Sequence, residues 1–215
     1  TWTVYAKEPF EADIPVYDSI RITKSVDPPI AYLIPAQWQE VIKRLTLHGI
    51  KVQRLAKPVE LDVEMYKFSN AKWQQTPYEG RHSVSYNTEK FSTKRIFPEG
   101  TAIIRLNQRA SRVTVFALEP ESPDAFVAWG FFDSIFEQKE YTEDYVMEPI
   151  AREMLSKDSG LKIEFENKLK SDSTFAKIPF ARLNFFYQHS PWWDENVNLY
   201  PVARLVNNVT LPIKD

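Results

Sequence analysis

The spacing of apolar residues changes about halfway along this chain, and that change constrains the fold more than any other feature of the sequence. Before residue 118 the apolar positions mostly alternate with polar ones, as in Val59–Tyr66 and Thr101–Leu106. After it they recur every three or four residues, as in Leu161, Phe165 and Leu169. A period of two is typical of a half-buried strand and a period of 3.6 of an amphipathic helix.

The period change predicts an α+β fold with an antiparallel β-sheet or sandwich, one helix in the N-terminal part and a helical C-terminal lobe. We expect a single domain over residues 1–215, with a β-rich part at 1–118 and a mainly helical lobe at 119–215, because no flexible linker separates them. The expected strands cover residues 18–24, 30–34, 59–66, 82–86, 101–106 and 112–118.

One helix is predicted inside the β-rich part, over residues 36–47, with His48 and Gly49 at its C-terminal end. In the second half, Ser122 and Pro123 resemble an N-cap and a first helical residue, which predicts a helix from there to Phe132. Further helices are expected at residues 141–155, 161–169 and 180–187, and the tail from residue 196 is expected to be loop with an edge strand.

Composition excludes several classes of function. The chain has 15 prolines, 5 glycines and no cysteine, which argues against glycine-rich phosphate loops and against thiol or Cys-ligated zinc chemistry. Its 27 basic and 29 acidic residues give no field that favours nucleic acid. We expect no membrane span and no cleaved leader in the residues given. A first residue of Thr leaves two alternatives open, an excised piece or a sequence lacking its leading residues.

The residues needed for a zinc or nucleophile site do not occur in a recognisable pattern. The three histidines, His48, His82 and His189, lack a Glu three positions later, so no His-x-x-Glu pair is present. No Gly-x-Ser-x-Gly elbow occurs either. The sequence therefore predicts no catalytic residue and no metal ligand in this chain.

One acidic cluster permits a hydrolase hypothesis. Glu119, Glu121 and Asp124 lie close together beside aromatic residues, and two carboxylates on opposite sides of a sugar bond can cleave it. The alternative is that they favour the positive N-terminal end of the helix expected at Ser122. Phe126 and Trp129 follow at once and could anchor an interface around these charges, so this segment is also a candidate docking surface.

Exposed aromatic residues permit a binding hypothesis. The chain has 6 tryptophans and 10 tyrosines, and flat aromatic faces stack on sugar rings. The candidates are those beside polar, turn-like sequence, namely Trp73, Tyr78, Trp192 and Trp193. The alternative for each is ordinary packing in a β-rich core.

Several stretches resemble the C-terminal region of large bacterial peptidase M14 (zinc carboxypeptidase-like) proteins. They are Pro35–Trp38, Arg44–Gly49, Leu118–Asp133, Ala181–Asp194 and Tyr200–Arg204, in an order and spacing that span most of the chain. The long middle stretch is the most specific. In that family a preceding catalytic domain binds zinc with a His-x-x-Glu pair and a later His, and none of those residues has a counterpart here.

The resemblance implies a non-catalytic C-terminal accessory domain that packs on or guards the catalytic domain of its parent. It further implies that zinc belongs to that domain, that the domain lies upstream in the same polypeptide, and that the parent is exported to the periplasm or secreted. Two alternatives stay open beside it: a module that binds carbohydrate or cell-wall peptide, and a hydrolase built on the acidic cluster.

Overall fold

The computed structural model describes residues 2–214 and has the α+β fold that the sequence predicts. All strands belong to one antiparallel sheet in the order β4-β3-β6-β1-β5-β2-β7. Its strands are β1 (Ala31–Ile34), β2 (Gln53–Leu55), β3 (Val59–Trp73), β4 (Val84–Phe97), β5 (Ala102–Arg105), β6 (Ala203–Leu205) and β7 (Ile213–Lys214).

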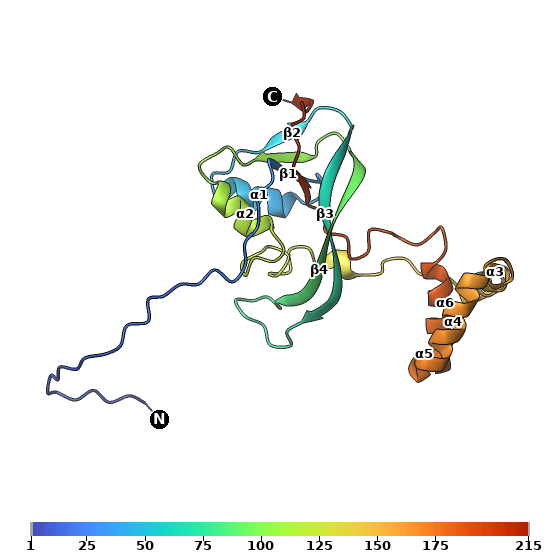
Figure 1. Ribbon diagram of the computed structural model, residues 1–215, viewed down its shortest axis with the longest axis horizontal. Coiled ribbons are helices and arrows are strands. Elements are labelled where there is room, and N and C mark those ends of the chain that lie inside the picture. Colours follow the sequence, from blue (N-terminus) through green and yellow to red (C-terminus); the bar gives the residue numbers. More distant parts are fainter. Residues whose placement is uncertain (1, 215) are drawn as a thin grey trace.

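Helices fall into two groups that Figure 1 shows well apart. The first group packs beside the sheet and consists of α1 (Gln39–Leu47) and α2 (Ser111–Leu118), followed by a 3-10 turn at Asp133–Phe136. We call the sheet together with this first group the sheet unit. The second group, which we call the helical unit, consists of α3 (Asp144–Lys157), α4 (Ser159–Ser171), α5 (Ser173–Lys177) and α6 (Pro179–Gln188). No helix formed by residues 2–214 has both the length and the hydropathy needed to cross a bilayer.

Successive side chains of a strand point to opposite faces of the sheet, and buried side chains are found on both faces. In β1, Tyr32 and Ile34 belong to the core that α1 and α2 cover, whereas Ala31 and Leu33 belong to the core on the other face. Residues 125–135, which come after α2 in the chain, also contribute side chains to the first of these cores. The helical unit has a third core of its own, which includes Met147 and Phe186.

The strongly periodic elements form as predicted. Helix α1 buries Val41, Ile42 and Leu45 on one face, and the chain leaves it through Gly49, whose φ of 76° suits glycine. His48 is its C-cap residue, as expected. The strands at 30–34, 59–66, 82–86 and 101–106 and the helices at 141–155, 161–169 and 180–187 are confirmed with shifted ends.

The prediction of a strand at residues 18–24 is wrong. The segment is extended but pairs with no strand, and Ile20 and Ile22 are 96% and 87% exposed. Alternation identifies an apolar face, but it does not supply the neighbouring strand that would hold the segment in a sheet.

Two further predictions on either side of residue 120 are also wrong. Residues 112–118 form a helix, because Thr114, Ala117 and Leu118 are buried at helical spacing. The β-branched Val113 and Val115 in the same segment favour a strand, but this preference is overridden. The segment from Ser122 to Phe132, expected to be a helix, is a series of turns. Its Phe126 amide donates a hydrogen bond to the Ala117 carbonyl oxygen.

The C-terminal tail contributes more than the expected edge strand. Strand β6 lies inside the sheet, where Ala31 pairs with Leu205 and Glu64 pairs with Arg204. Of the two strands in the tail, β7 is the one at an edge of the sheet. The helical part of the predicted lobe at 119–215 is therefore confined to residues 144–188, and the chain on both sides of it packs with the sheet.

Helix α1 allows a controlled test of this packing, because its two leucines have opposite environments. Leu45 is fully buried and Leu47 is 76% exposed. We expect Leu45→Ala to lower the free energy of unfolding by about 2–5 kcal/mol through lost contacts and the cavity left behind. Leu47→Ala, the matched control, should change it by less than about 0.5 kcal/mol. Equal losses in urea denaturation of the two variants would contradict the placement of α1.

Candidate functional site

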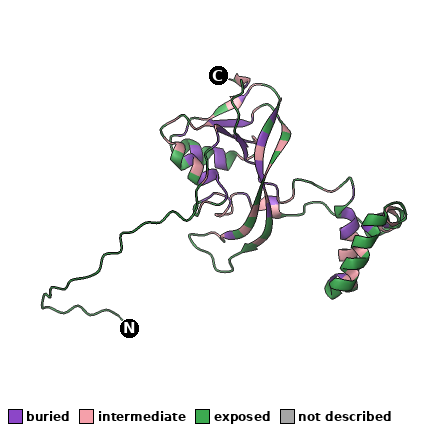
Figure 2. Cartoon of the chain, in the orientation of Figure 1, coloured by how far each residue is buried: buried purple, intermediate pink, exposed green. Residues whose placement is uncertain are grey.

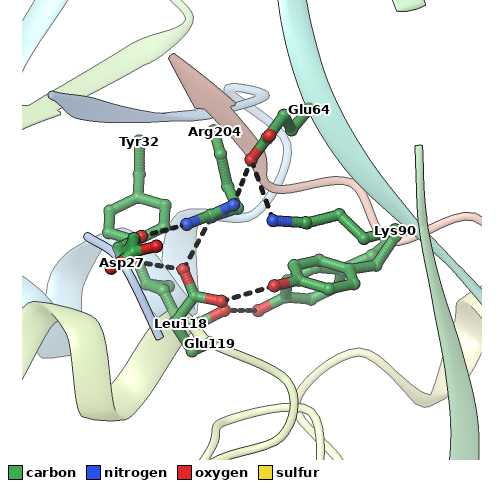
Figure 3. Close-up of polar contacts among 9 residues, drawn as sticks. Asp27, Tyr32, Glu64, Lys90, Leu118, Glu119 and Arg204 are labelled. Carbon is green, nitrogen blue, oxygen red and sulfur yellow. Dashed lines mark hydrogen bonds and ion pairs between the residues drawn. The ribbon is translucent and has the colours of Figure 1, made fainter. Parts of the chain in front are cut away.

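A buried polar network at the centre of the sheet unit is the main concentration of charged groups inside the protein (Figure 3). Arg204 of β6 is 2% exposed and Glu119, directly after α2, is also 2% exposed. Arg204 Nε donates to Glu119 Oε1 at 2.9 Å. Arg204 also pairs with Glu64 of β3 and donates to the Asp27 carbonyl oxygen.

Tyrosine hydroxyls complete the hydrogen bonding of the Glu119 carboxylate. Tyr32 donates to Oε1 at 2.5 Å, and Tyr66 donates to Oε2 at 2.8 Å. Beside them, Tyr200 donates to the Leu118 carbonyl oxygen at 2.9 Å. A buried carboxylate is tolerated only when its charge is paired and its oxygens accept hydrogen bonds, and both conditions are met here.

Electrostatics keep these groups in the protonation states that the network needs. Burial, reinforced by the charge of Glu119, raises the pKa of Tyr32 and of Tyr66 far above the usual tyrosine value, so both remain donors. Burial alone would lower the pKa of Arg204, but the interactions with Glu119, Tyr66, Glu64 and Tyr32 together outweigh burial, and the pKa is raised. The arginine therefore stays positive at any ordinary pH.

The network joins chain segments that are far apart in sequence. It ties the end of α2 to β1, β3 and β6, and its Arg204–Asp27 contact reaches the chain before β1. Glu119 is the C-cap residue of α2, where the helix dipole disfavours a carboxylate. The pairing with Arg204 offsets that disadvantage. The arrangement is suited to holding the strands together, because both Glu119 oxygens are occupied by protein donors.

The other two acidic candidates lie at the surface. Glu121 pairs with Lys24 at 2.6 Å and accepts a hydrogen bond from Thr88 at 2.7 Å. Burial acts to raise the pKa of Glu121, but the hydrogen bonds from Lys24 and Thr88 outweigh it and the pKa is lowered. No helix begins at Ser122, so the expected N-terminal capping by these acids is wrong, and Ser122 Oγ is buried without a partner among residues 2–214.

Asp124, Phe126 and Trp129 do come together. They line a shallow depression of about 490 Å³ with Arg44, Arg81 and Phe131 among its other residues. The Arg44 and Arg81 guanidinium groups lie 4.5 and 3.9 Å from the centre of the Phe131 ring. The depression thus combines both signs of charge with aromatic surface.

The aromatic candidates are not assembled into one shelf. Trp73 packs edge-on against Phe136, and Tyr78 lies 6.1 Å from Trp129 between ring centres. Trp192 and Trp193 follow α6 in the helical unit, where Trp193 packs against Tyr187 and Trp192 is 60% exposed. Within residues 2–214, Tyr78 is thus the one of these four aromatic candidates whose ring packs against the ring of another predicted site residue, Trp129.

Sequence reasoning missed most of the network, including Tyr32, Glu64, Tyr66 and Arg204. One signal was available: Arg204 is the single charged residue in the apolar run Val202–Leu205, and a charge in such a run needs a buried partner. The sequence does not indicate which acid that partner is, because Glu119 is 85 residues away.

Zinc, which the M14 resemblance places in the parent protein, has no matching ligand set in this chain. Within residues 2–214, no group of three or more His, Cys, Asp or Glu side chains is arranged to hold a metal ion. The buried carboxylate of Glu119 is taken up by Arg204 and two tyrosines instead. The residues present therefore do not fit a zinc site.

Comparison with known proteins finds similarity to carboxypeptidases. Carboxypeptidase 2 of Trichophyton tonsurans is 30% identical over 102 residues, which is 47% of this chain and 19% of that protein. Carboxypeptidase 2 of Trichophyton rubrum matches to the same extent. The probable carboxypeptidase 2 of Arthroderma benhamiae is 28% identical over 96 residues, or 45% of this chain and 18% of that protein.

The chain contains a carboxypeptidase-related region. The match spans about a fifth of the length of these fungal relatives. No protein-family model matches the chain, and no solved structure matches it. The relatives support the carboxypeptidase part of the resemblance, whereas a bacterial origin and a C-terminal position remain predictions.

Two glutamates two residues apart provide a direct test of the network. We expect Glu119→Gln to lower the free energy of unfolding by about 3–5 kcal/mol, because it removes the fully buried negative charge beside Arg204 and leaves only the partly exposed Glu64 to balance the arginine. Glu121→Gln, the control, removes only a surface ion pair and should cost about 0–1 kcal/mol. Chemical denaturation of both variants measures the difference. Similar small losses would mean that the Glu119 carboxylate does not stabilise the fold.

Proposed function

We propose that this chain is a non-catalytic accessory region of a zinc-carboxypeptidase-like protein, which packs on or guards the catalytic domain of its parent. The observation that carries the proposal is the partial similarity to carboxypeptidases, which covers 47% of this chain but only 19% of the first relatives. Most of such a relative lies outside the match and leaves room for a separate catalytic domain. Zinc, in this proposal, belongs to that domain.

The side-chain arrangement supports an accessory role over the hydrolase alternative. A carboxylate pair for glycoside cleavage needs one group free to give a proton and another free to attack or to activate water. Glu119 is buried with both oxygens engaged, and Glu121 is held by Lys24 and Thr88. These two carboxylates therefore hold chain segments together.

The binding alternative receives narrower support. Its aromatic candidates are divided between the sheet unit and the helical unit, and their contacts are mainly with neighbouring aromatic side chains. Three of the predicted residues, Asp124, Phe126 and Trp129, line the depression described above. We retain it as a surface through which the region could contact a peptide or glycan that approaches the catalytic domain. An exported location, periplasmic or secreted, also belongs to the proposal through the M14 resemblance.

The full-length polypeptide that carries this chain tests the proposal. We expect it to release the C-terminal residue of a peptide with a free carboxylate, and we expect a chelator to abolish that activity and added Zn²⁺ to restore it. The purified chain of residues 1–215 should release none under the same conditions. Hydrolysis by the isolated chain, or no metal-dependent release by the full-length polypeptide, would contradict the proposal.

A further inference from the structure

Residues 2–22 form an apolar arm that the other described residues do not cover. Figure 1 shows this segment running away from the sheet without helix or strand and turning back before the N-terminus, and Figure 2 shows it exposed along its length. Between residues 2 and 22, nine large apolar side chains are at least 76% exposed. They are Trp2, Val4, Tyr5, Phe10, Ile14, Val16, Tyr17, Ile20 and Ile22.

The apolar residues of the arm lie mostly at alternate positions. Seven of its nine large apolar residues occupy even-numbered positions, and only Tyr5 and Tyr17 occupy odd ones. The chain bends at residues 7 and 8, and in an extended stretch alternate residues point the same way, so Phe10, Ile14, Val16, Ile20 and Ile22 would share one face where residues 10–22 are extended. Pro9 and Pro15 cannot donate to a strand ladder, which limits main-chain pairing to the stretches between them.

The chain itself does not bury this face. None of the nine side chains belongs to any of the three cores formed by the described residues. Scattered exposed apolar residues are normal, but a one-sided run of this size marks an interaction surface.

The root of the arm is fixed while its apolar face stays open. Arg204 of the buried network donates to the Asp27 carbonyl oxygen, and Lys24 pairs with Glu121. These two contacts determine where the arm leaves the sheet unit. The same network that closes the sheet thus presents the arm in a defined direction.

We propose that residues 2–22 dock in extended form on an apolar surface or sheet edge of the catalytic domain in the same polypeptide. This inference rests on the proposed function and identifies the element that makes the contact. Extended segments bind in this way by adding a strand to an exposed edge, with alternate side chains entering pockets. A covalently linked domain outcompetes a second copy of the chain, because linkage gives it an effective concentration on the order of millimolar.

Hydrogen exchange measured on two proteins tests the docking. In the isolated chain of residues 1–215, amides of the arm should exchange at rates typical of exposed backbone. In the full-length polypeptide, the same amides between the prolines should exchange at least about tenfold more slowly. Ile20→Ser in the full-length polypeptide should restore fast exchange in the arm. Ile163→Ser on α4, which replaces an isoleucine that is 60% exposed outside the arm, should leave the arm protected.

Three results separate this inference from the function on which it rests. Fast exchange of the arm in a full-length polypeptide that is an active carboxypeptidase overturns the docking alone. A protected arm in a full-length polypeptide without carboxypeptidase activity overturns the proposed function, and with it the identity of the docking partner. Protection of the isolated chain that grows with its concentration, accompanied by a doubled mass in light scattering, overturns the docking in favour of a second copy.

Discussion

The buried ion pair between Arg204 and Glu119 is the interaction on which the sheet unit depends. Arg204 lies on β6, which is only three residues long and sits between β3 and β1 in the middle of the sheet. So short a strand supplies few ladder hydrogen bonds. The Arg204 side chain adds hydrogen bonds to Glu119, Glu64 and the Asp27 carbonyl oxygen. These bonds help to hold β6, which follows the helical unit in the chain, between β3 and β1.

Burying two opposite charges is costly, and the protein offsets that cost by saturating the carboxylate with donors. Tyr32 and Tyr66 approach Glu119 from neighbouring parts of the sheet and remain protonated, because burial raises the pKa of each hydroxyl. This arrangement decides between two uses of Glu119. A catalytic acid needs a free oxygen facing a substrate, whereas here both oxygens face protein donors. The contacts that we propose for this region involve other surfaces, namely the exposed apolar arm and the depression beside Trp129.

The sequence predicted the elements whose apolar pattern is long and regular. Helix α1 and the first part of strand β3 are examples. Helix α1 buries Val41, Ile42 and Leu45 on one face, and Leu61, Val63 and Met65 are buried at alternate positions of β3, so the period of each is clear. Predictions failed where tertiary packing decides. Residues 112–118 carry β-branched side chains but form α2, and residues 122–132 form a series of turns whose side chains pack onto the core. The alternation at Ile20 and Ile22 predicts a strand of this sheet, but these residues belong to the exposed arm instead. Of the candidate site, Glu119 was identified from sequence, but its partner Arg204 was not, since only the fold brings them together.

A double-mutant cycle on Glu119 and Arg204 tests the central claim most directly. It requires the free energies of unfolding of the unmodified chain, Glu119→Gln, Arg204→Met and the double variant. If the two side chains stabilise the fold as a pair, the double variant loses less than the sum of the single losses, by a coupling energy of about 1–3 kcal/mol. Losses that add to within about 0.3–0.5 kcal/mol would contradict the account, because they would show that the two residues stabilise the protein independently.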